Sequence, residues 1–186
     1  MTNPPIEFPV EGLVGDAIRL RLRADSDVPA MVEACNDPAI QRYTVVPANY
    51  DEANARDYAQ MSSTGLAEGT GLHLVIAGRD DDELLGTIAL RRVGAEPGRW
   101  SVGYWVAPWA RRRGVASEAL RLITRFGFDE LEAQVIELLA EPENLASQRV
   151  ATAGGFTRGP LLRNRIVIKG STHDVLMYTL LPPAPG

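Results

Sequence analysis

Seven segments of this chain have the apolar pattern of β-strands. In several of them apolar and polar residues alternate with a period of two, which places one face of a strand against a core. In the first, Ile18, Leu20 and Leu22 alternate with arginines. The segments are 16–23, 72–77, 84–92, 100–106, 132–139, 156–162 and 165–180. We expect the last two to form a hairpin, with a break near Gly170 and Ser171.

Four other segments have apolar residues at helical spacing. The clearest begins beside Gly114, and its apolar face consists of Val115, Ala119, Leu122, Ile123 and Phe126. The others are expected to start at Asp25 or Ser26, at Asp51 and near Asn144, because these residue types are good N-caps. They are expected to end near residues 37–38, 63 and 154. The pattern therefore indicates one α+β domain at residues 15–181, between an irregular arm at 1–14 and a tail at 182–186.

Composition narrows the class of protein. Apolar residues make up 45% of the 186 residues, which is ordinary for a soluble globular chain. No apolar run is long enough to span a membrane, and the first residues lack the pattern of a secretory signal. A net charge of −5 argues against nonspecific nucleic-acid binding and mildly favours a cationic acceptor.

The single cysteine, Cys35, cannot form an internal disulfide, which suits a reducing cytoplasm. It lies on the apolar side of the first expected helix, and free cysteine is among the most buried residue types. We therefore expect Cys35 in the core and the protein in the cytoplasm.

Three consecutive arginines, Arg111, Arg112 and Arg113, stand where a strand is expected to turn into a helix. Cations are disfavoured there, because the unpaired N–H groups and the dipole already make a helix start positive. A bound anion such as a phosphate would remove the conflict. Gly114 would let the backbone approach that anion closely, and Ala116 adds little side chain. If only the three arginines are considered, the alternative interpretation is that they are solvated surface residues without a ligand.

A second motif, residues 144–156, follows a strand that ends before Pro142. It contains Asn-Leu-Ala-Ser-Gln-Arg-Val-Ala and ends in Gly-Gly-Phe, which predicts a short helix capped by Asn144 and stopped by glycine. From spacing alone, Asn144 would be only a cap and Ser147 only a polar residue of the first turn.

Together, in this order, the two motifs resemble the GNAT superfamily of N-acetyltransferases. Residues 111–116, Arg-x-x-Gly-x-Ala, are similar to its acetyl-CoA signature, and residues 144–156 resemble the ribosomal-protein alanine N-acetyltransferase (Rim-type) branch. The resemblance covers about residues 16–181. It implies an α+β, three-layer fold with a mixed, mostly antiparallel sheet of about seven strands, splayed between strands four and five and flanked by about four helices.

The resemblance also implies an acetyl-CoA site and a reaction. Backbone N–H groups of the loop 106–117 would hold the pyrophosphate, and the pantetheine would enter the splay. The implied cofactor-binding residues are Tyr104, Trp105, Val106, Arg111, Arg112, Arg113, Gly114, Val115, Ala116, Ser117, Asn144 and Ser147. Ser147 is also a candidate general acid for the leaving thiolate, beside Asn144. The implied reaction is direct attack of a neutral amine on the thioester in a ternary complex, with no metal.

The general base stays unassigned, because this chain departs from the patterns of its relatives. The glutamate that often follows the Gly-Phe turn is absent, since the chain reads Thr157-Arg158. The acid that many members carry on the fourth strand is Ser101 here, and the tyrosine that other branches use is Ala151.

Four titratable residues are weak candidates for the base. Glu141 stands at the end of the fifth strand and Asp174 on the last strand, and a structural or solvated role is the favoured interpretation of each. His73 and His173 titrate in the useful range, but they lie in strand-like segments away from the motifs.

The missing acid favours an acceptor amine of low pKa. A protein α-amino group has a reference pKa of about 7.7–8.0, against about 10.4 for lysine, so it needs less help from a base. The leading hypothesis is therefore acetylation of a protein N-terminus, with small-molecule amines (a polyamine, amino acid or antibiotic) and a non-catalytic coenzyme A-binding module as alternatives. Tyr43 and Trp109 are weak candidates for the walls of the acceptor groove, near Arg42 and Tyr50. A homodimer is left open.

Overall fold

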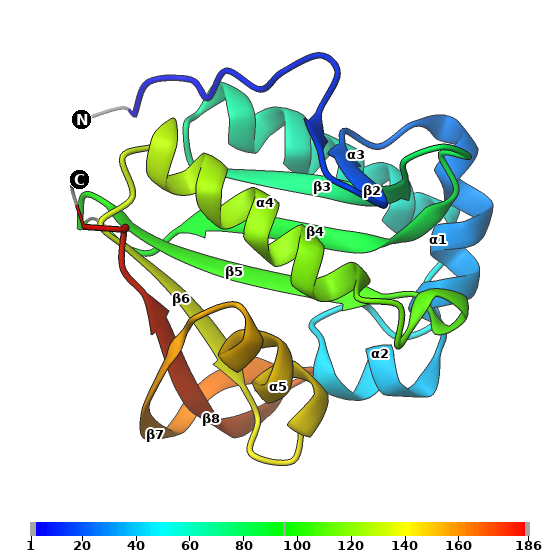
Figure 1. Ribbon diagram of the computed structural model, residues 1–186. Helices are drawn as coiled ribbons and strands as arrows, with labels where there is room; N and C mark the ends of the chain where they lie inside the picture. Colours follow the sequence, from blue (N-terminus) through cyan, green and yellow to red (C-terminus); the bar gives the residue numbers. More distant parts are fainter. Residues whose placement is uncertain (1–2, 95, 185–186) are drawn as a thin grey trace.

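One eight-stranded sheet forms the centre of the protein in the computed structural model, which describes residues 3–94 and 96–184 (Figure 1). Its strands lie in the order β1-β2-β3-β4-β5-β6-β8-β7. Within the described residues, β5 and β6 are the one parallel pair of neighbours. The strands are β1 (Leu13–Val14), β2 (Ile18–Arg21), β3 (Gly71–Gly78), β4 (Leu84–Arg92), β5 (Arg99–Val106), β6 (Val135–Ala140), β7 (Thr157–Ile168) and β8 (Ser171–Leu180).

Helices cover both faces of this sheet. They are α1 (Val28–Cys35), α2 (Pro38–Tyr43), α3 (Glu52–Ala67), α4 (Val115–Asp129) and α5 (Leu145–Ala153). In Figure 1, α4 lies across the front of β4 and β5 and contacts α5, whereas α1 and α3 pack together behind the sheet. The predicted three-layer fold with a mixed, mostly antiparallel sheet is therefore confirmed, with one strand and one helix more than expected.

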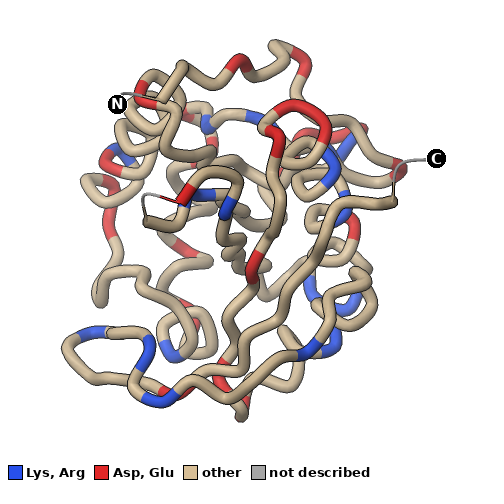
Figure 2. The backbone as a smooth tube through the Cα atoms, turned by 90° about the vertical axis from the view of Figure 1, so that its left-hand side faces the viewer, with Lys and Arg blue, Asp and Glu red and all other residues tan. Residues whose placement is uncertain are grey.

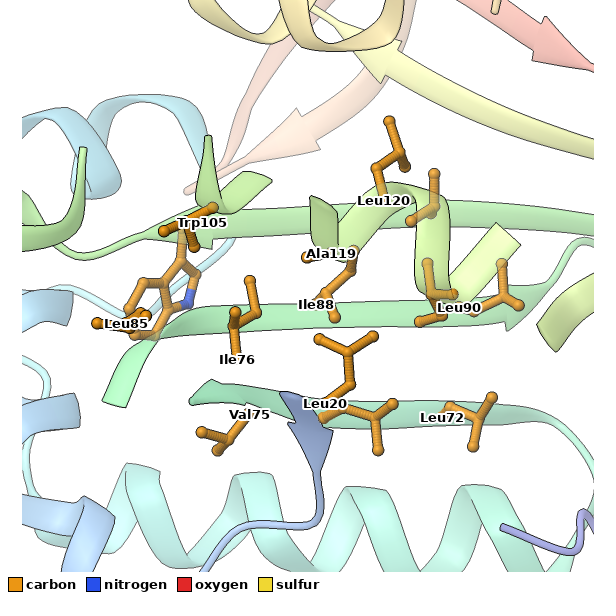
Figure 3. Close-up of a cluster of buried hydrophobic side chains, with 14 of the residues drawn as sticks. Leu20, Leu72, Val75, Ile76, Leu85, Ile88, Leu90, Trp105, Ala119 and Leu120 are labelled. Carbon is orange, nitrogen blue, oxygen red and sulfur yellow. The ribbon is translucent and has the colours of Figure 1, made fainter. Parts of the chain in front are cut away.

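Apolar side chains fill the space between the layers. Every residue of β3 is buried, because the strand lies in the middle of the sheet and is covered on both faces. Figure 3 shows Ile88 of β4 beside Ala119 and Leu120 of α4, in the same buried apolar cluster as Leu72 of β3. This core fixes α4 against β4 and β5, so the loop that joins β5 to α4 starts and ends on rigid elements.

β5 and β6 pair only over their first halves. The parallel register runs from Arg99 opposite Val135 to Val102 opposite Leu138. Beyond it, β5 continues to pair with β4 and β6 continues to pair with β8, so the two strands diverge (Figure 1). The predicted splay is confirmed. On this side of residues 103–106 the backbone N–H and C=O groups have no partner in β6.

The sequence missed helix α2. The first helix ends at Cys35 as expected, but Asp37 then caps a second helix by accepting hydrogen bonds from the N–H groups of Ala39 and Ile40 at 3.0 and 3.1 Å. Pro38 takes the first helical position, where its missing N–H costs nothing. Asp37 and Pro38, which we expected to end the first helix, therefore begin α2.

The C-terminal hairpin also differs from the expectation. We expected one strand to begin at residue 165 and to break near Gly170 and Ser171, but β7 continues to Ile168 and the turn lies at Lys169-Gly170. Both turn residues have positive φ, 48° and 83°, as two-residue hairpin turns require. Residues 163–164, which lay between the two expected strands, are part of an irregular stretch of β7 where its register with β8 shifts, between Leu162 and Ile166.

The segment that we expected to be irregular packs against the domain. Leu13 and Val14 form the short strand β1 against β2. Upstream, the N–H group of Ile6 donates to the carbonyl of Leu66 at 2.8 Å, and the Phe8 ring meets that of Phe126 edge-on, with centroids 5.8 Å apart.

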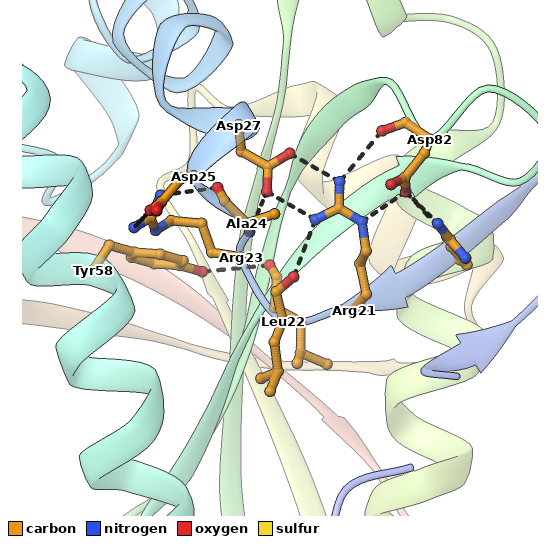
Figure 4. A network of polar contacts seen from close by, with 10 residues as sticks. Arg21, Leu22, Arg23, Ala24, Asp25, Asp27, Tyr58 and Asp82 are labelled. Atoms are coloured by element: carbon orange, nitrogen blue, oxygen red, sulfur yellow. Dashed lines mark hydrogen bonds and ion pairs between the residues drawn. The ribbon is translucent and has the colours of Figure 1, made fainter. Parts of the chain in front are cut away.

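A closed network of charges joins the first strand to its neighbours. The guanidinium of Arg21 donates to both carboxylate oxygens of Asp27 at 2.8 Å and to Asp82 at 2.7 Å (Figure 4). Asp27 also accepts from the N–H group of Ala24 at 2.7 Å, and its side chain is only 4% exposed. The network therefore ties β2 to the start of α1 and to the turn between β3 and β4.

Acidic and basic residues are interspersed along the chain and not collected on one basic face (Figure 2). None of the helices in the described residues is both long and apolar enough to cross a bilayer. Within the same residues, no three His, Cys, Asp or Glu side chains come together in a way that would hold a metal ion.

Candidate active site

The loop between β5 and α4 leads into backbone N–H groups that have no hydrogen-bond acceptor in the described residues. The first hydrogen bond of α4 runs from the N–H of Glu118 to the carbonyl of Gly114 at 3.0 Å, so the N–H groups of residues 115–117 have no acceptor within the helix. Gly114 has a φ of 79°, and a Cβ added to it would meet no heavy atom within 4 Å. The start of α4 therefore leaves N–H groups for an anion, and an anion at this loop stays a prediction from its arginines.

The three arginines of this loop have different roles in the structure. Arg111 pairs with Asp37 at the start of α2, and this hydrogen bond is the main reason that the pKa of Asp37 lies below its ordinary value. Arg112 and Arg113 are exposed and make no ion pair within the described residues. Arg111 thus fixes the loop to α2, and the other two guanidinium groups remain available for a ligand.

The diverging half of β5 faces the start of α5. The hydroxyl of Tyr104, on β5, lies 3.1 Å from the hydroxyl of Ser147, in the first turn of α5. Burial raises the pKa of Tyr104 to about 12, although the Ser147 hydrogen bond opposes it, so the phenol is protonated at neutral pH. Asn144 caps α5, because its side-chain oxygen accepts from the N–H of Ser147 at 3.1 Å. Four predicted binding residues, Tyr104, Val106, Asn144 and Ser147, therefore line or flank the splay.

A second polar cluster lies where β6 ends. Glu141 accepts two hydrogen bonds from Arg42 of α2, at 2.8 and 3.0 Å, and its Oε2 lies 3.1 Å from Nδ1 of His173 on β8. Burial raises the pKa of Glu141, but the hydrogen bonds from Arg42 and His173 outweigh it and hold that pKa below its ordinary value. These residues line a pocket of about 340 Å³, together with Glu143, Thr172 and Asp174.

This cluster was not apparent from the sequence. Glu141 and His173 were separate weak candidates, 32 positions apart, and Arg42 is 99 positions from Glu141. No local pattern links them, because only the β6–β8 pairing and the position of α2 bring them together. Asp174 has a structural contact instead, since it accepts from the N–H of Asn164 in the irregular stretch of β7 at 2.8 Å.

The other candidates lie nearer the core. Trp105 is only 8% exposed, and the indole of Trp109 donates to the carbonyl of Leu84 at 3.0 Å. Tyr43 is half-buried beneath the guanidinium of Arg42, 4.8 Å from its ring centroid, beside the pocket. Tyr50, expected near the acceptor groove, is buried.

Cys35 is in the core, as predicted, and burial raises its pKa to about 12. It is therefore an unreactive thiol. His73 is buried in β3, where it packs edge-on against Tyr58.

Comparison with known proteins agrees with this geometry. Residues 18–157 match the family model of the acetyltransferase (GNAT) domain. An uncharacterized N-acetyltransferase of Bacillus licheniformis, p20, is 30% identical over 172 residues, which cover 92% of this chain and 97% of that protein.

Solved structures share the fold at lower identity. A putative ribosomal-protein-serine acetyltransferase from Vibrio cholerae superposes with a TM-score of 0.81 at 22% identity, over 95% of this chain and 100% of that one. RimL, a ribosomal α-N-protein acetyltransferase in complex with coenzyme A, superposes with a TM-score of 0.76 at 21% identity, over 94% and 97%. The protein is therefore a member of the GNAT family of acetyltransferases, an enzyme that takes acetyl-CoA as its acetyl donor.

Proposed function

We propose that this enzyme acetylates the α-amino group of a protein N-terminus, by direct attack of the amine on acetyl-CoA in a ternary complex. The observation that carries the proposal is the position of Ser147 and Tyr104 beside the divergence of β5 and β6, close to the open start of α4. Acetyl-CoA supplies the acetyl group as a thioester.

The residues present fit the donor. The N–H groups of residues 115–117 and the side chains of Arg112 and Arg113 would hold its phosphates, because a helix start and guanidinium groups both favour anions. The backbone of residues 103–106 would hydrogen-bond the amides of the pantetheine arm, since β6 leaves that edge without a partner. Gly103 supports this role, because a Cβ there would meet no heavy atom within 4 Å.

Ser147 would protonate the leaving sulfur. Its hydroxyl is hydrogen-bonded to Tyr104, whose phenol remains protonated at neutral pH and can keep the serine oriented. Asn144 would hold the first turn of α5 in place through its cap. The buried, unreactive Cys35 supports a direct transfer without an acetyl-enzyme.

Two arguments support an N-terminal α-amine as the acceptor. An α-amine is partly neutral at pH 7, so it needs less help from a base than a lysine side chain does. This suits a site whose carboxylate, Glu141, has a pKa below its ordinary value and is therefore a weak base. In addition, one of the solved structures with this fold, RimL, is by its name an α-N-protein acetyltransferase. We expect the peptide to approach over the pocket beside Glu141.

An acceptor screen tests the proposal. Purified enzyme and acetyl-CoA are incubated with peptides that have a free N-terminus, with the same peptides N-terminally blocked but carrying a free lysine, and with polyamines, amino acids and amine-containing antibiotics. Release of free thiol is the readout. We expect turnover with free N-termini above all others. Preferred turnover of a small amine would replace the proposed acceptor, and binding of acetyl-CoA without thiol release on any amine would indicate a coenzyme A-binding module.

A further inference from the structure

Arg42, Glu141 and His173, the cluster at the end of β6, are arranged like a histidine base that a carboxylate holds in one orientation. Glu141 is only 6% exposed and is held on one side by two hydrogen bonds from Arg42. On its other side lies His173, whose ring is 21% exposed and borders the pocket. The three residues come from α2, from the chain after β6 and from β8, so the fold holds them from three directions.

The hydrogen bond between Glu141 and His173 fixes the tautomer of the ring. With the Arg42 guanidinium against it, Glu141 is ionised at neutral pH and can only accept hydrogen bonds. Nδ1 of His173 must then carry the proton of the 3.1 Å contact. In the neutral ring, Nε2 therefore carries a lone pair, and none of the described residues makes a hydrogen bond to it.

The pocket also suits a cation. Its walls carry the carboxylates of Glu141, Glu143 and Asp174 and one guanidinium, that of Arg42. These charged groups come from α2, from the segment after β6 and from β8 itself, and of them Glu141 contacts the His173 ring directly. On the paired strand β7, the residue opposite His173 is the apolar Ile166. An ammonium group in this pocket would meet an excess of negative charge.

The pocket is joined to the helix that carries Ser147. The carbonyl of Glu141 accepts from the N–H of Asn144 at 3.0 Å and from the side chain of Gln148 at 3.3 Å. On the other side, Lys169 in the β7–β8 turn donates to the side chain and the carbonyl of Gln41 in α2. The pocket is therefore built on the same rigid segment as the proposed acid, which would keep the two groups at a fixed separation.

We infer that His173 is the general base that deprotonates the acceptor ammonium, that Glu141 is its positioning residue, and that the pocket around them binds the cationic amine. This inference rests on the proposed acetyl transfer. The ammonium gives one proton to Nε2 of His173 and becomes a neutral amine. Its nitrogen then forms the bond to the acetyl carbon as the C–S bond breaks. Ser147 gives its hydroxyl proton to the sulfur, the nitrogen loses its second proton, which restores the Ser147 hydroxyl, and His173 releases its own proton to solvent.

The test is His173→Asn, because the asparagine amide keeps an N–H near the position of Nδ1 but offers no base at Nε2. We expect kcat to fall by about 10²–10³-fold, the acid-side limb of the pH profile of kcat/KM to disappear, and acetyl-CoA binding by calorimetry to stay unchanged. Glu141→Gln should lower kcat by about 10-fold and leave the KM for acetyl-CoA unchanged, because His173 keeps its base but loses the carboxylate that fixes its tautomer. His73→Gln is the matched control, as it replaces the only other histidine and should leave the limb in place.

A wild-type rate and pH limb in a folded His173→Asn enzyme would overturn the inference. If that variant does not fold, the ¹⁵N NMR signals of His173 in the native enzyme decide: protonated Nδ1 and unprotonated Nε2 in the neutral ring support the inference, and the opposite tautomer overturns it. Failure of the wild-type enzyme to acetylate any amine would instead overturn the proposed function, so the two failures are distinguishable.

Discussion

Asp27 and Glu141 are buried carboxylates that each bind an arginine, but their surroundings differ. Asp27 meets Arg21 inside a network in which both carboxylate oxygens and all three guanidinium nitrogens have partners from the chain (Figure 4). Glu141 also accepts two hydrogen bonds from its arginine, Arg42, but the Arg42 side chain is 47% exposed. His173, which contacts the other side of Glu141, borders a pocket.

The difference separates structural polar groups from groups that remain available for chemistry. A polar group whose hydrogen bonds all go to the chain stabilises the fold and has nothing left to offer a ligand. A group that is held firmly on one side and open on the other is positioned for binding or proton transfer. The same contrast holds within the loop before α4, where Arg111 is paired with Asp37 and Arg112 and Arg113 are not.

The largest effect should come from the closed network. Asp27→Asn leaves Arg21 with Asp82 as its remaining carboxylate partner, and we expect it to lower the free energy of unfolding by about 3 kcal/mol, at the low end of the range for a broken buried ion pair. Chemical denaturation measures this change. The kcat of the folded fraction should stay at the wild-type value, and a loss of kcat without a loss of stability would break the comparison.

The buried histidine should make stability depend on pH. Burial lowers the pKa of His73 from 6.5 to about 4, so below pH 6.5 the unfolded chain binds a proton that the folded chain does not. Stability is therefore complete above pH 6.5 and falls as the pH drops toward 4, by at most about 3 kcal/mol, at about 1.36 kcal/mol per pKa unit. Denaturation curves between pH 4 and 7 should show this slope in the wild type and a reduced slope in His73→Gln. An equal slope in both would assign the effect to other groups.

The open hydroxyl at the splay should affect turnover and not stability. Ser147→Ala is expected to lower kcat by about 10²-fold and to leave acetyl-CoA affinity nearly unchanged, because the proton is needed only as sulfur leaves. Thr152→Ala removes a hydroxyl from the exposed side of the same helix and serves as the control for steady-state kinetics. Unchanged turnover would remove Ser147 from the mechanism.

The unpaired arginines should give the smallest effect. Replacing Arg112 and Arg113 together by alanine is expected to weaken acetyl-CoA binding about 10-fold, since the N–H groups of α4 remain. Arg125→Ala, at the other end of α4, is the control. Titration calorimetry at two salt concentrations measures the effect, and an unchanged dissociation constant would identify the two arginines as solvated surface.

Much of the fold and part of the site could be predicted from the sequence. Local signals were sufficient for the caps Asp51 and Asn144 and for the helix start at Gly114, whereas the splay was implied by the family resemblance. Helix α2 was missed because an Asp-Pro pair such as Asp37-Pro38 is found both where helices end and where they begin, so the pair alone does not distinguish the two. The Glu141–His173 contact could not be predicted, because it depends on strand pairing between distant segments and not on any local pattern.

The most direct test of the account is hydrogen–deuterium exchange of the wild-type enzyme with and without acetyl-CoA. We propose that the donor lies between the start of α4 and the free edge of β5. Acetyl-CoA should therefore slow exchange at the amides of residues 103–106 and 112–117 and leave exchange in β7 and in the segment around Asp27 unchanged. Slower exchange elsewhere, with no change in these two segments, would contradict it.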